Sequence, residues 1–277
     1  MRTGKNGFIG RDTFALRKSP AVGVTAVALF ALGVAALPGD RLGSFLLGHG
    51  GVTATNLGNA LFRLLGAGIL LLLALDLGYG ICGVRGRGRG MLLALPFLLV
   101  AVNNAPWIGL LTGSVTVQAG AGAYLVFALY CAAVGLAEES AFRGIVLPLL
   151  LGAFPKTRKH TLWAVLLSSA IFGAAHLINL LSSPPLAVLA QVGYSFLIGC
   201  MCAVTLLLTR SIWACALLHA LYDFCGLLAD ALGSGQVWSA ASIALTAAVG
   251  AAAAGYGIFL FVKKMRIQEV RLLYDTN

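Results

Sequence analysis

The sequence predicts an all-α, polytopic transmembrane helical bundle of about eight spans, with both termini in the cytoplasm. Of its 277 residues, 60% are hydrophobic and only 10% are charged, whereas soluble domains are about 25% charged. Apolar runs of about 18–25 residues, the length that crosses a bilayer, recur between residues 20 and 262. A soluble fold could not bury this much apolar surface, so we expect an integral multi-pass membrane protein.

The predicted spans follow from the apolar runs along the chain. They cover residues 20–38, 58–83, 91–112, 119–153, 161–181, 185–208, 211–231 and 238–262. The run 119–153 is too long for one straight span, so we expect a tilted or kinked helix that bends near Pro148. The transmembrane domain thus covers residues 20–262, between an N-terminal arm of residues 1–19 and a C-terminal tail of residues 263–277.

Lys and Arg residues set the predicted orientation, because cytoplasmic loops carry an excess of them. They occur in the N-terminal arm and after the even-numbered spans: Arg2, Lys5, Arg11, Arg17 and Lys18; Arg85, Arg87 and Arg89; Lys156, Arg158 and Lys159; Arg210; Lys263, Lys264 and Arg266. The opposite loops hold Arg41, and Arg63 stands at the start of the second predicted span. Both termini are therefore predicted to be cytoplasmic.

The net charge of +10 follows from these basic flanks. Because no span alternates basic with aromatic residues, we expect the lipid bilayer as a partner and no nucleic acid. Small residues cluster at Gly120–Ala123 and at Gly250–Gly257, where we expect helices to pack closely.

Ionisable side chains inside the spans are candidates for function, because burying a charge in lipid is costly. They are Asp76, Glu138, Glu139, Arg143, His176, His219, Asp223 and Asp230, with Asn103, Asn104 and Asn179 as further polar groups. Asp76, Asn103 and Asn104 either line a substrate cavity or satisfy one another. Six of the ionisable residues fall into three short motifs.

The first motif is Glu138-Glu139-Ser140-Ala141-Phe142-Arg143. Glu139 and Arg143 stand one helical turn apart and can pair, while Glu138 lies about 100° around the helix and faces elsewhere. A neutralised acid beside a free one suits acid–base chemistry. The alternative is one buried ion pair plus an acid at the membrane surface.

The other two motifs are Phe172-Gly173-Ala174-Ala175-His176 and His219-Ala220-Leu221-Tyr222-Asp223. A spacing of four places His219 and Asp223 on one helix face, where the carboxylate can orient the imidazole. Each motif also fits a structural role: His176 can bond a neighbouring carbonyl, and the His219–Asp223 pair can tether two helices. The three motifs can meet near mid-membrane only if the helix of Glu138 continues to about residue 153.

At these residues the sequence resembles the CAAX-processing and bacteriocin-immunity membrane peptidases, also called the Abi family, which the type II prenyl-protein endopeptidase typifies. That family carries Glu-Glu-x-x-x-Arg, Phe-x-x-x-His and His-x-x-x-Asn or Asp on separate transmembrane helices. The same order stands here in Glu138-Glu139…Arg143, Phe172…His176 and His219…Asp223. The resemblance covers residues 119–231.

The resemblance implies an intramembrane endopeptidase in which Glu138 activates water and His176 assists. His219 and Asp223 would then stabilise the oxyanion, with Glu139, Arg143 and Phe172 in support. Asp223 stands where eukaryotic members tend to have Asn; it must be protonated, orient His219 or bind a cation. We expect no cofactor, and Zn²⁺ is the alternative, because Glu138, His176, His219 and Asp223 offer nitrogen and oxygen ligands that zinc accepts.

The expected substrate is a peptide or a membrane-anchored protein, lipidated or not. Two other functions stay open: a proton- or ion-coupled transporter, since buried acids and histidines form proton relays, and a non-catalytic membrane scaffold or bacteriocin-immunity factor. The Gly- and Ala-rich composition favours a prokaryotic cytoplasmic membrane.

Overall fold

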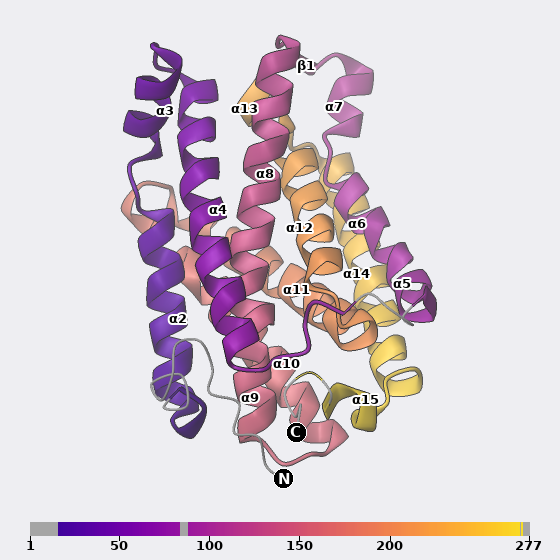
Figure 1. The fold of residues 1–277 in the computed structure, drawn as a ribbon. Coiled ribbons are helices and arrows are strands. Elements are labelled where there is room, and N and C mark those ends of the chain that lie inside the picture. Colours follow the sequence, from indigo (N-terminus) through magenta and orange to yellow (C-terminus); the bar gives the residue numbers. More distant parts are fainter. Residues whose placement is uncertain (1–15, 84–87, 272, 274–277) are drawn as a thin grey trace.

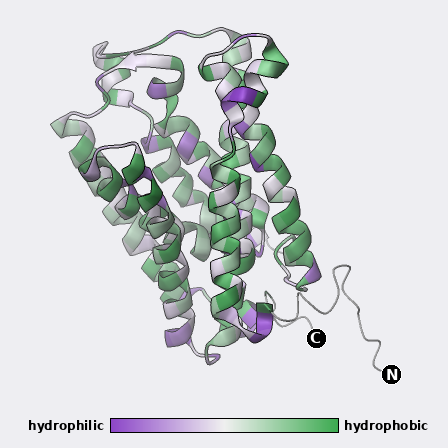
Figure 2. Cartoon of the chain, turned by 90° about the vertical axis from the view of Figure 1, so that its left-hand side faces the viewer, coloured by the Kyte–Doolittle hydropathy of each residue, from purple (hydrophilic) through white to green (hydrophobic). Residues whose placement is uncertain are grey.

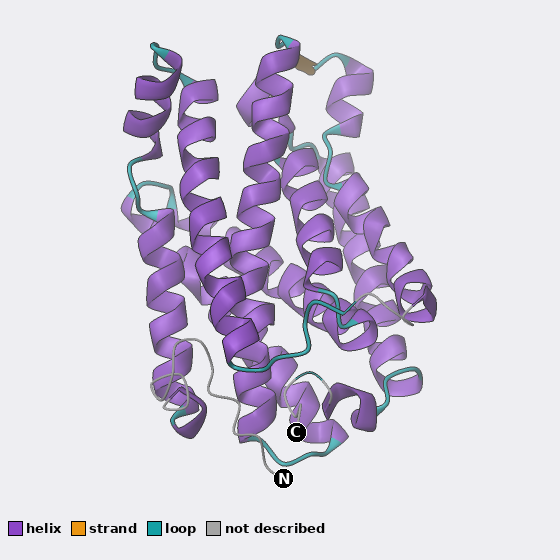
Figure 3. Cartoon of the chain, viewed as in Figure 1, coloured by secondary structure: helices purple, strands orange, loops and turns teal. Residues whose placement is uncertain are grey.

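The computed structural model describes residues 16–83, 88–271 and 273, and it is an all-α bundle (Figures 1 and 3), which confirms the predicted fold class. The elements follow in this order: α2 Pro20–Ala35, α3 Gly39–Leu47, α4 Val52–Asp76, α5 Gly88–Ala94, a 3₁₀ turn Leu95–Phe97, α6 Leu98–Asn103, α7 Trp107–Thr112, β1 Val115–Val117, α8 Ala121–Ala141, a π-helical turn Phe142–Val146, α9 Leu147–Ala153, α10 Arg158–Ala175, a 3₁₀ helix His176–Leu181, α11 Pro185–Thr209, α12 Ile212–Gly226, α13 Leu228–Leu232, β2 Gly233–Gly235, α14 Ala240–Lys263 and α15 Ile267–Arg271.

Each of the eight predicted spans coincides with one or more of these helices. Over the described ranges, five helices are long and apolar enough to cross a membrane, or six if the bent pair α2 and α3 forms one span. The apolar segments Gly88–Asn103 and Ile212–Gly226 are shorter. The number of eight crossings therefore stays a prediction.

The connections between helices gather at two opposite ends of the bundle (Figure 1). At one end, the backbone of Cys82 forms a bridge with Ser211, and the Arg158 guanidinium donates to the Val262 carbonyl. At the other end, β1 and β2 form an antiparallel pair that the sequence did not predict. The chain returns to the first end after every even-numbered predicted span.

Basic residues mark the first of these ends, where Arg17 lies over the ring of Tyr79, 5.1 Å from its centroid. The described Lys and Arg residues that were expected to be cytoplasmic lie in the helix ends and loops on this side, while Arg41 belongs to α3 on the other. The predicted cytoplasmic residues Arg2, Lys5, Arg11, Arg85 and Arg87 lie outside the described residues. The arrangement favours the predicted orientation, which itself stays a prediction.

The four tryptophans are divided between the two ends, and all are exposed: Trp163 and Trp213 near the starts of α10 and α12, and Trp107 and Trp238 at the opposite end. Exposed Trp is typical of the two membrane–water interfaces. Figure 2 shows hydrophobic residues along the outer faces of the helices between these ends. The surface is that of a protein that stands across a bilayer.

Side-chain caps explain where several helices begin. Thr157 accepts a hydrogen bond from the backbone N–H of His160 at the start of α10, and Ser211 does the same for Ala214 at the start of α12. Ser239 and Ser242 form a reciprocal capping box at the start of α14. Each cap satisfies backbone donors that the first turn of a helix leaves unpaired.

The long helix of the first motif continues to Ala153, as convergence of the three motifs required. Its irregular turn is not centred on Pro148 but lies just before it, at Phe142–Val146, where the N–H of Leu147 bonds to the carbonyl of Phe142. Proline lacks an N–H and disturbs the preceding turn, and such π-helical turns are frequent at functional sites. Arg143 lies within this turn.

Close helix packing occurs at other glycines than those the sequence indicated. Among the described atoms, none lies within 4 Å of a Cβ added at Gly120, Gly122, Gly250 or Gly255, whereas one added at Gly257 would lie 3.7 Å from the Phe97 ring, an ordinary contact. Of the glycines in these two clusters, only Gly257 therefore has a neighbour, and tight packing is not found there. Instead, α3 and α4 are so close at Gly43 that a side chain there would overlap the Ala54 carbonyl. Small residues permit another helix to approach closely, but they do not show which face of a helix has a neighbouring helix.

Candidate active site

Two helices bring the first and third motifs together. α8 and α12 pack directly at Gly135, where an added Cβ would lie 2.7 Å from the carbonyl oxygen of Ala216. This close approach places His219, on α12, against both glutamates of α8. Nδ1 of His219 lies 2.8 Å from Oε1 of Glu139, and Nε2 lies 3.7 Å from Oε2 of Glu138.

Glu139 is held from two sides. Its Oε1 atom also accepts a hydrogen bond of 3.0 Å from Nη1 of Arg143, one helical turn away, as the spacing predicted. Both side chains are fully buried. The Arg143 guanidinium lies 4.5 Å from the ring centroid of Phe172, and a Cβ added at Gly199 would come within 2.7 Å of Nη2. Glu139 therefore connects a buried cation to the imidazole and cannot meet a substrate.

The neighbouring acids remain accessible. The side chains of Glu138 and Asp223 are 25% and 18% exposed, against 0% for Glu139. Oδ2 of Asp223 lies 3.6 Å from the same Nε2 atom that faces Glu138. One side of the His219 ring is thus closed by Glu139, and the other side opens between two carboxylates.

Asp223 does not orient His219 in the way that the spacing predicted. The short hydrogen bond to the ring comes from Glu139, 80 residues away in sequence, whereas the Asp223 contact exceeds hydrogen-bond length. The carboxylate is on the expected helix face, but it lies beside Nε2 and leaves Nδ1 to the buried acid.

His176 joins the cluster through the ring of Phe172. The Phe172 ring centroid lies 5.1 Å from that of His176 and 5.8 Å from that of His219, nearly perpendicular to both. Nδ1 of His176 lies 3.0 Å from the carbonyl oxygen of Phe172; because a carbonyl only accepts, Nδ1 carries the proton. In the neutral ring Nε2 is then an acceptor. Within the described chain, His176 makes no ion pair with Glu138.

Zinc was the alternative cofactor, and the geometry of the proposed ligands can be compared with it. Over residues 16–83, 88–271 and 273, no group of three or more His, Cys, Asp or Glu side chains is arranged to hold a metal ion. Nδ1 of His219 is occupied by Glu139, while Nε2 faces Glu138 and Asp223 at 3.7 and 3.6 Å; His176 stands apart behind Phe172. Because a metal-bound His usually donates its other ring nitrogen to a carboxylate, Zn²⁺ stays the alternative, with Nε2 of His219 as its nitrogen ligand.

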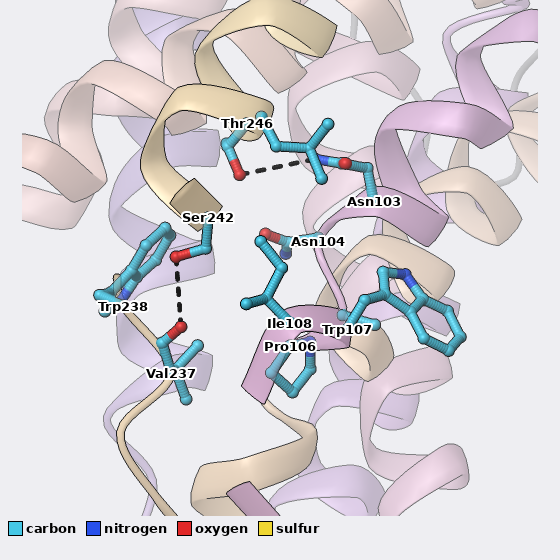
Figure 4. A pocket seen from close by; sticks show the side chains of 11 residues that line it. Asn103, Asn104, Pro106, Trp107, Ile108, Val237, Trp238, Ser242 and Thr246 are labelled. Carbon is cyan, nitrogen blue, oxygen red and sulfur yellow. Dashed lines mark hydrogen bonds between the residues drawn. The ribbon is translucent and has the colours of Figure 1, made fainter. Parts of the chain in front are cut away.

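The other polar candidates lie elsewhere. Asn103 and Asn104 line an open cleft with Trp107, Trp238 and Thr246 among its walls (Figure 4). Their side chains point in different directions: Nδ2 of Asn103 lies 3.5 Å from Oγ1 of Thr246, and Nδ2 of Asn104 donates to the carbonyl of Tyr222.

The remaining three candidates do not join the cluster of carboxylates. Asp76 ends α4 and does not line the cleft of Figure 4, so it is not satisfied by the two asparagines. Asn179 donates to Gln191 on α11. Asp230 is exposed on α13.

Sequence reasoning missed Arg63. The second span was expected to begin at residue 58, which placed Arg63 near its start, but α4 begins at Val52. Arg63 is therefore at the middle of a spanning helix, and its guanidinium lies 5.9 Å from the ring centroid of Tyr130 on α8. The apolar residues on both sides of Arg63 were the available signal.

Residues 120–225 match the family model described as "Rce1-like: Type II CAAX prenyl endopeptidase Rce1-like". No curated protein sequence and no solved structure matches the chain. The matched segment contains all three motifs and runs from the start of α8 almost to the end of α12. It supports a CAAX-type intramembrane protease in general. Through these residues, the chain is similar to the CAAX-processing family of membrane peptidases that its motifs resemble.

Proposed function

We propose that this protein is an intramembrane endopeptidase that hydrolyses a peptide bond of a membrane-associated or lipidated substrate with water activated by Glu138. The observation that carries the proposal is the position of His219. Its Nδ1 atom is bound to the buried Glu139, and its Nε2 atom faces the accessible Glu138 at 3.7 Å. A base and a ring N–H are thus directed at one small space.

The hydrogen bonds of His219 define its part in the reaction. Oε1 of Glu139 accepts from Arg143 as well, so Nδ1 of His219 must be a donor. For Nε2 to donate to an oxyanion, the ring has to carry its second proton. Asp223, 3.6 Å from Nε2, then serves as the counter-charge of the imidazolium. This role accounts for an acid at a position where an asparagine would donate directly.

The reaction would proceed in two steps. Glu138 takes a proton from water as the oxygen attacks the scissile carbonyl carbon, and Nε2–H of His219 donates to the oxyanion that forms. Glu138 then returns the proton to the leaving amine as the C–N bond breaks. Nε2 of His176 accepts a second hydrogen bond from the attacking water. General acid–base catalysis contributes about 10²–10⁴-fold, and one oxyanion donor about 10²–10³-fold.

A set of variants tests the proposal with an internally quenched peptide that carries a farnesylated cysteine followed by three residues. Glu138→Gln and His219→Ala should each lower kcat by at least about 100-fold, and His176→Ala should lower it as well. Asp230→Asn is the matched control, because Asp230 is an acid that lies outside the three motifs and is exposed on α13. Circular dichroism and size-exclusion profiles verify folding.

Cleavage that persists in all three active-site variants would refute the assignment. The metal alternative is tested on the same preparation by elemental analysis and by dialysis against a chelator. We expect the dialysed enzyme to keep its activity. Loss of activity on dialysis, restored by stoichiometric Zn²⁺, would replace the glutamate mechanism by a metal-dependent one.

A further inference from the structure

Two adjacent asparagines lie at the turn after α6, and the proposed reaction uses neither of them. α6 ends at Asn103, and Asn104 follows as its C-terminal cap. The turn is braced, because the indole Nε1 of Trp107 donates to the carbonyl of Val102. Both asparagines lie outside residues 120–225, the segment that matches the family model. Their side chains point to different helices (Figure 4).

Asn104 holds the last turn of α12. Its Nδ2 atom donates a hydrogen bond of 2.9 Å to the carbonyl oxygen of Tyr222, 118 residues further along the chain. Gly226 makes room for this contact, because a side chain there would overlap the Asn104 amide. Asn103 takes no part in it, since its own Nδ2 atom lies 3.5 Å from Oγ1 of Thr246 on α14. Asn104 thus links the end of α6 to α12, and Asn103 links it to a different helix.

The turn that Asn104 holds also carries Asp223. The Asp223 carboxylate lies 3.6 Å from Nε2 of His219, which is longer than a hydrogen bond. In the described part of the chain, no hydrogen bond fixes the Asp223 side chain. Its position therefore depends on the backbone of α12, which ends three residues later, at Gly226. Helix ends fray unless a contact from outside holds them.

We propose that Asn104 is a positioning residue of the active site, whose amide holds the carbonyl of Tyr222 and with it the Asp223 carboxylate. This role rests on the proposed peptidase function and adds to it a residue from outside the three motifs. Tyr222 directly precedes Asp223, so a displaced carbonyl moves the carboxylate away from Nε2 of His219. Because the hydrogen bond exists before substrate arrives, the counter-charge needs no rearrangement when the oxyanion forms.

Identical substitutions at the two neighbouring asparagines test this role. Asn104→Leu removes the donor and nearly keeps the size of the side chain. We expect kcat for the farnesylated peptide to fall about tenfold with little change in KM, because Asp223 acts on His219 and not on the bound peptide. Asn103→Leu is the matched control and should keep the wild-type kcat, since its contact is with α14. Equal kcat values for the two variants would overturn the proposal.

The same hydrogen bond can be broken from the side of α12. The methyl group of Gly226→Ala would overlap the amide of Asn104, which is the end of a half-buried side chain and can swing aside without unfolding the protein. We expect kcat to fall about tenfold here as well. Gly68→Ala on α4 is the control, because no described atom lies within 4 Å of its added Cβ. A wild-type kcat in Gly226→Ala would contradict the role of the contact.

NMR of the ¹⁵N-labelled ring of His219, recorded on the inert Glu138→Gln protein, separates this inference from the proposed function. Asp223→Ala gives the signal of a ring that has lost its carboxylate. Asn104→Leu should move the His219 signal in the same direction, whereas Asn103→Leu should leave it in place. When Asp223→Ala is already present, Asn104→Leu should cause no further shift.

This pattern of shifts supports the positioning role even in a protein that cleaves no peptide, and in that case only the peptidase proposal fails. An unchanged His219 signal in Asn104→Leu would overturn the inference. An equal shift with and without Asp223 would do so too, because it would show that Asn104 supports the fold in general and does not act through the carboxylate.

Discussion

Two adjacent glutamates have opposite surroundings, and their difference follows from one residue of helical rotation. Glu139 points into the protein, where Arg143 and His219 share its Oε1 atom. Glu138 points toward the accessible side of the His219 ring. The buried acid fixes the imidazole, and the accessible acid remains free for a proton. Neither residue could replace the other, because their side chains leave α8 about 100° apart.

The Glu139–Arg143 pair should be costly to break but replaceable for folding alone. Arg143→Met leaves Glu139 charged and buried, so we expect a loss of about 3–5 kcal/mol in the free energy of unfolding. Glu139→Gln combined with Arg143→Met removes both charges and should regain much of that stability. Unfolding in mixed detergent micelles measures both effects.

Activity distinguishes the two roles of the pair. The double variant should remain inactive, because the His219 ring loses the carboxylate that holds Nδ1. An active double variant would show that Glu139 serves only to neutralise Arg143. An Arg143→Met protein as stable as the wild type would show that the ion pair does not stabilise the fold.

At the scale of elements, the distance between α8 and α12 decides whether the two glutamates meet His219. A Cβ at Gly135 would lie 2.7 Å from the Ala216 carbonyl oxygen and 2.9 Å from the backbone nitrogen of Ala220. Both atoms belong to helical backbone and cannot yield without a shift of the whole helix. Gly122 is on the same helix α8, but nothing described lies within 4 Å of its added Cβ.

This pair of glycines gives a matched test. Gly135→Ala should separate the helices and lower kcat/KM at least about tenfold, since small misplacements at reacting groups are costly. Gly122→Ala should keep full activity and stability, because Gly122 is in the first turn of α8 and its added Cβ would meet no described atom. Thermal unfolding and peptide cleavage are measured on both proteins. Equal activity of the two variants would mean that the contact at Gly135 does not set the geometry of the site.

At the scale of the whole molecule, local spacing predicted what lies on one helix and little of what lies between helices. The fold class and the Glu139–Arg143 pair followed from apolar runs and from a spacing of four. The Glu139–His219 hydrogen bond joins residues 80 positions apart, and no periodicity encodes it. Arg63 was missed because the polar first turns of α4 obscured where the helix begins, and helix contacts at glycines depend on neighbours that composition does not reveal.

The two ends of the bundle predict a definite membrane topology. The backbone bridge between Cys82 and Ser211 joins loops at the basic end, while β1 pairs with β2 at the other. With basic loops in the cytoplasm, green fluorescent protein fused after Lys264 should fluoresce in a bacterial host. Alkaline phosphatase fused after Gly235 should be active, since that enzyme needs an oxidising compartment for its disulfides.

The same fusions determine the number of crossings, which helix length alone leaves at five or six for the described residues. If the short segment Gly88–Asn103 does not cross, the loop that follows α4 and the fusion point after Gly235 lie on the same side of the membrane. With eight crossings they lie on opposite sides. Without the crossing by Gly88–Asn103, phosphatase fused after Gly50 and after Gln118 should differ in activity, whereas eight crossings make both active. Glu138 and His219 belong to α8 and α12, two helices that run in opposite directions. Their shared pocket lies within the bilayer only if both of these helices cross the bilayer.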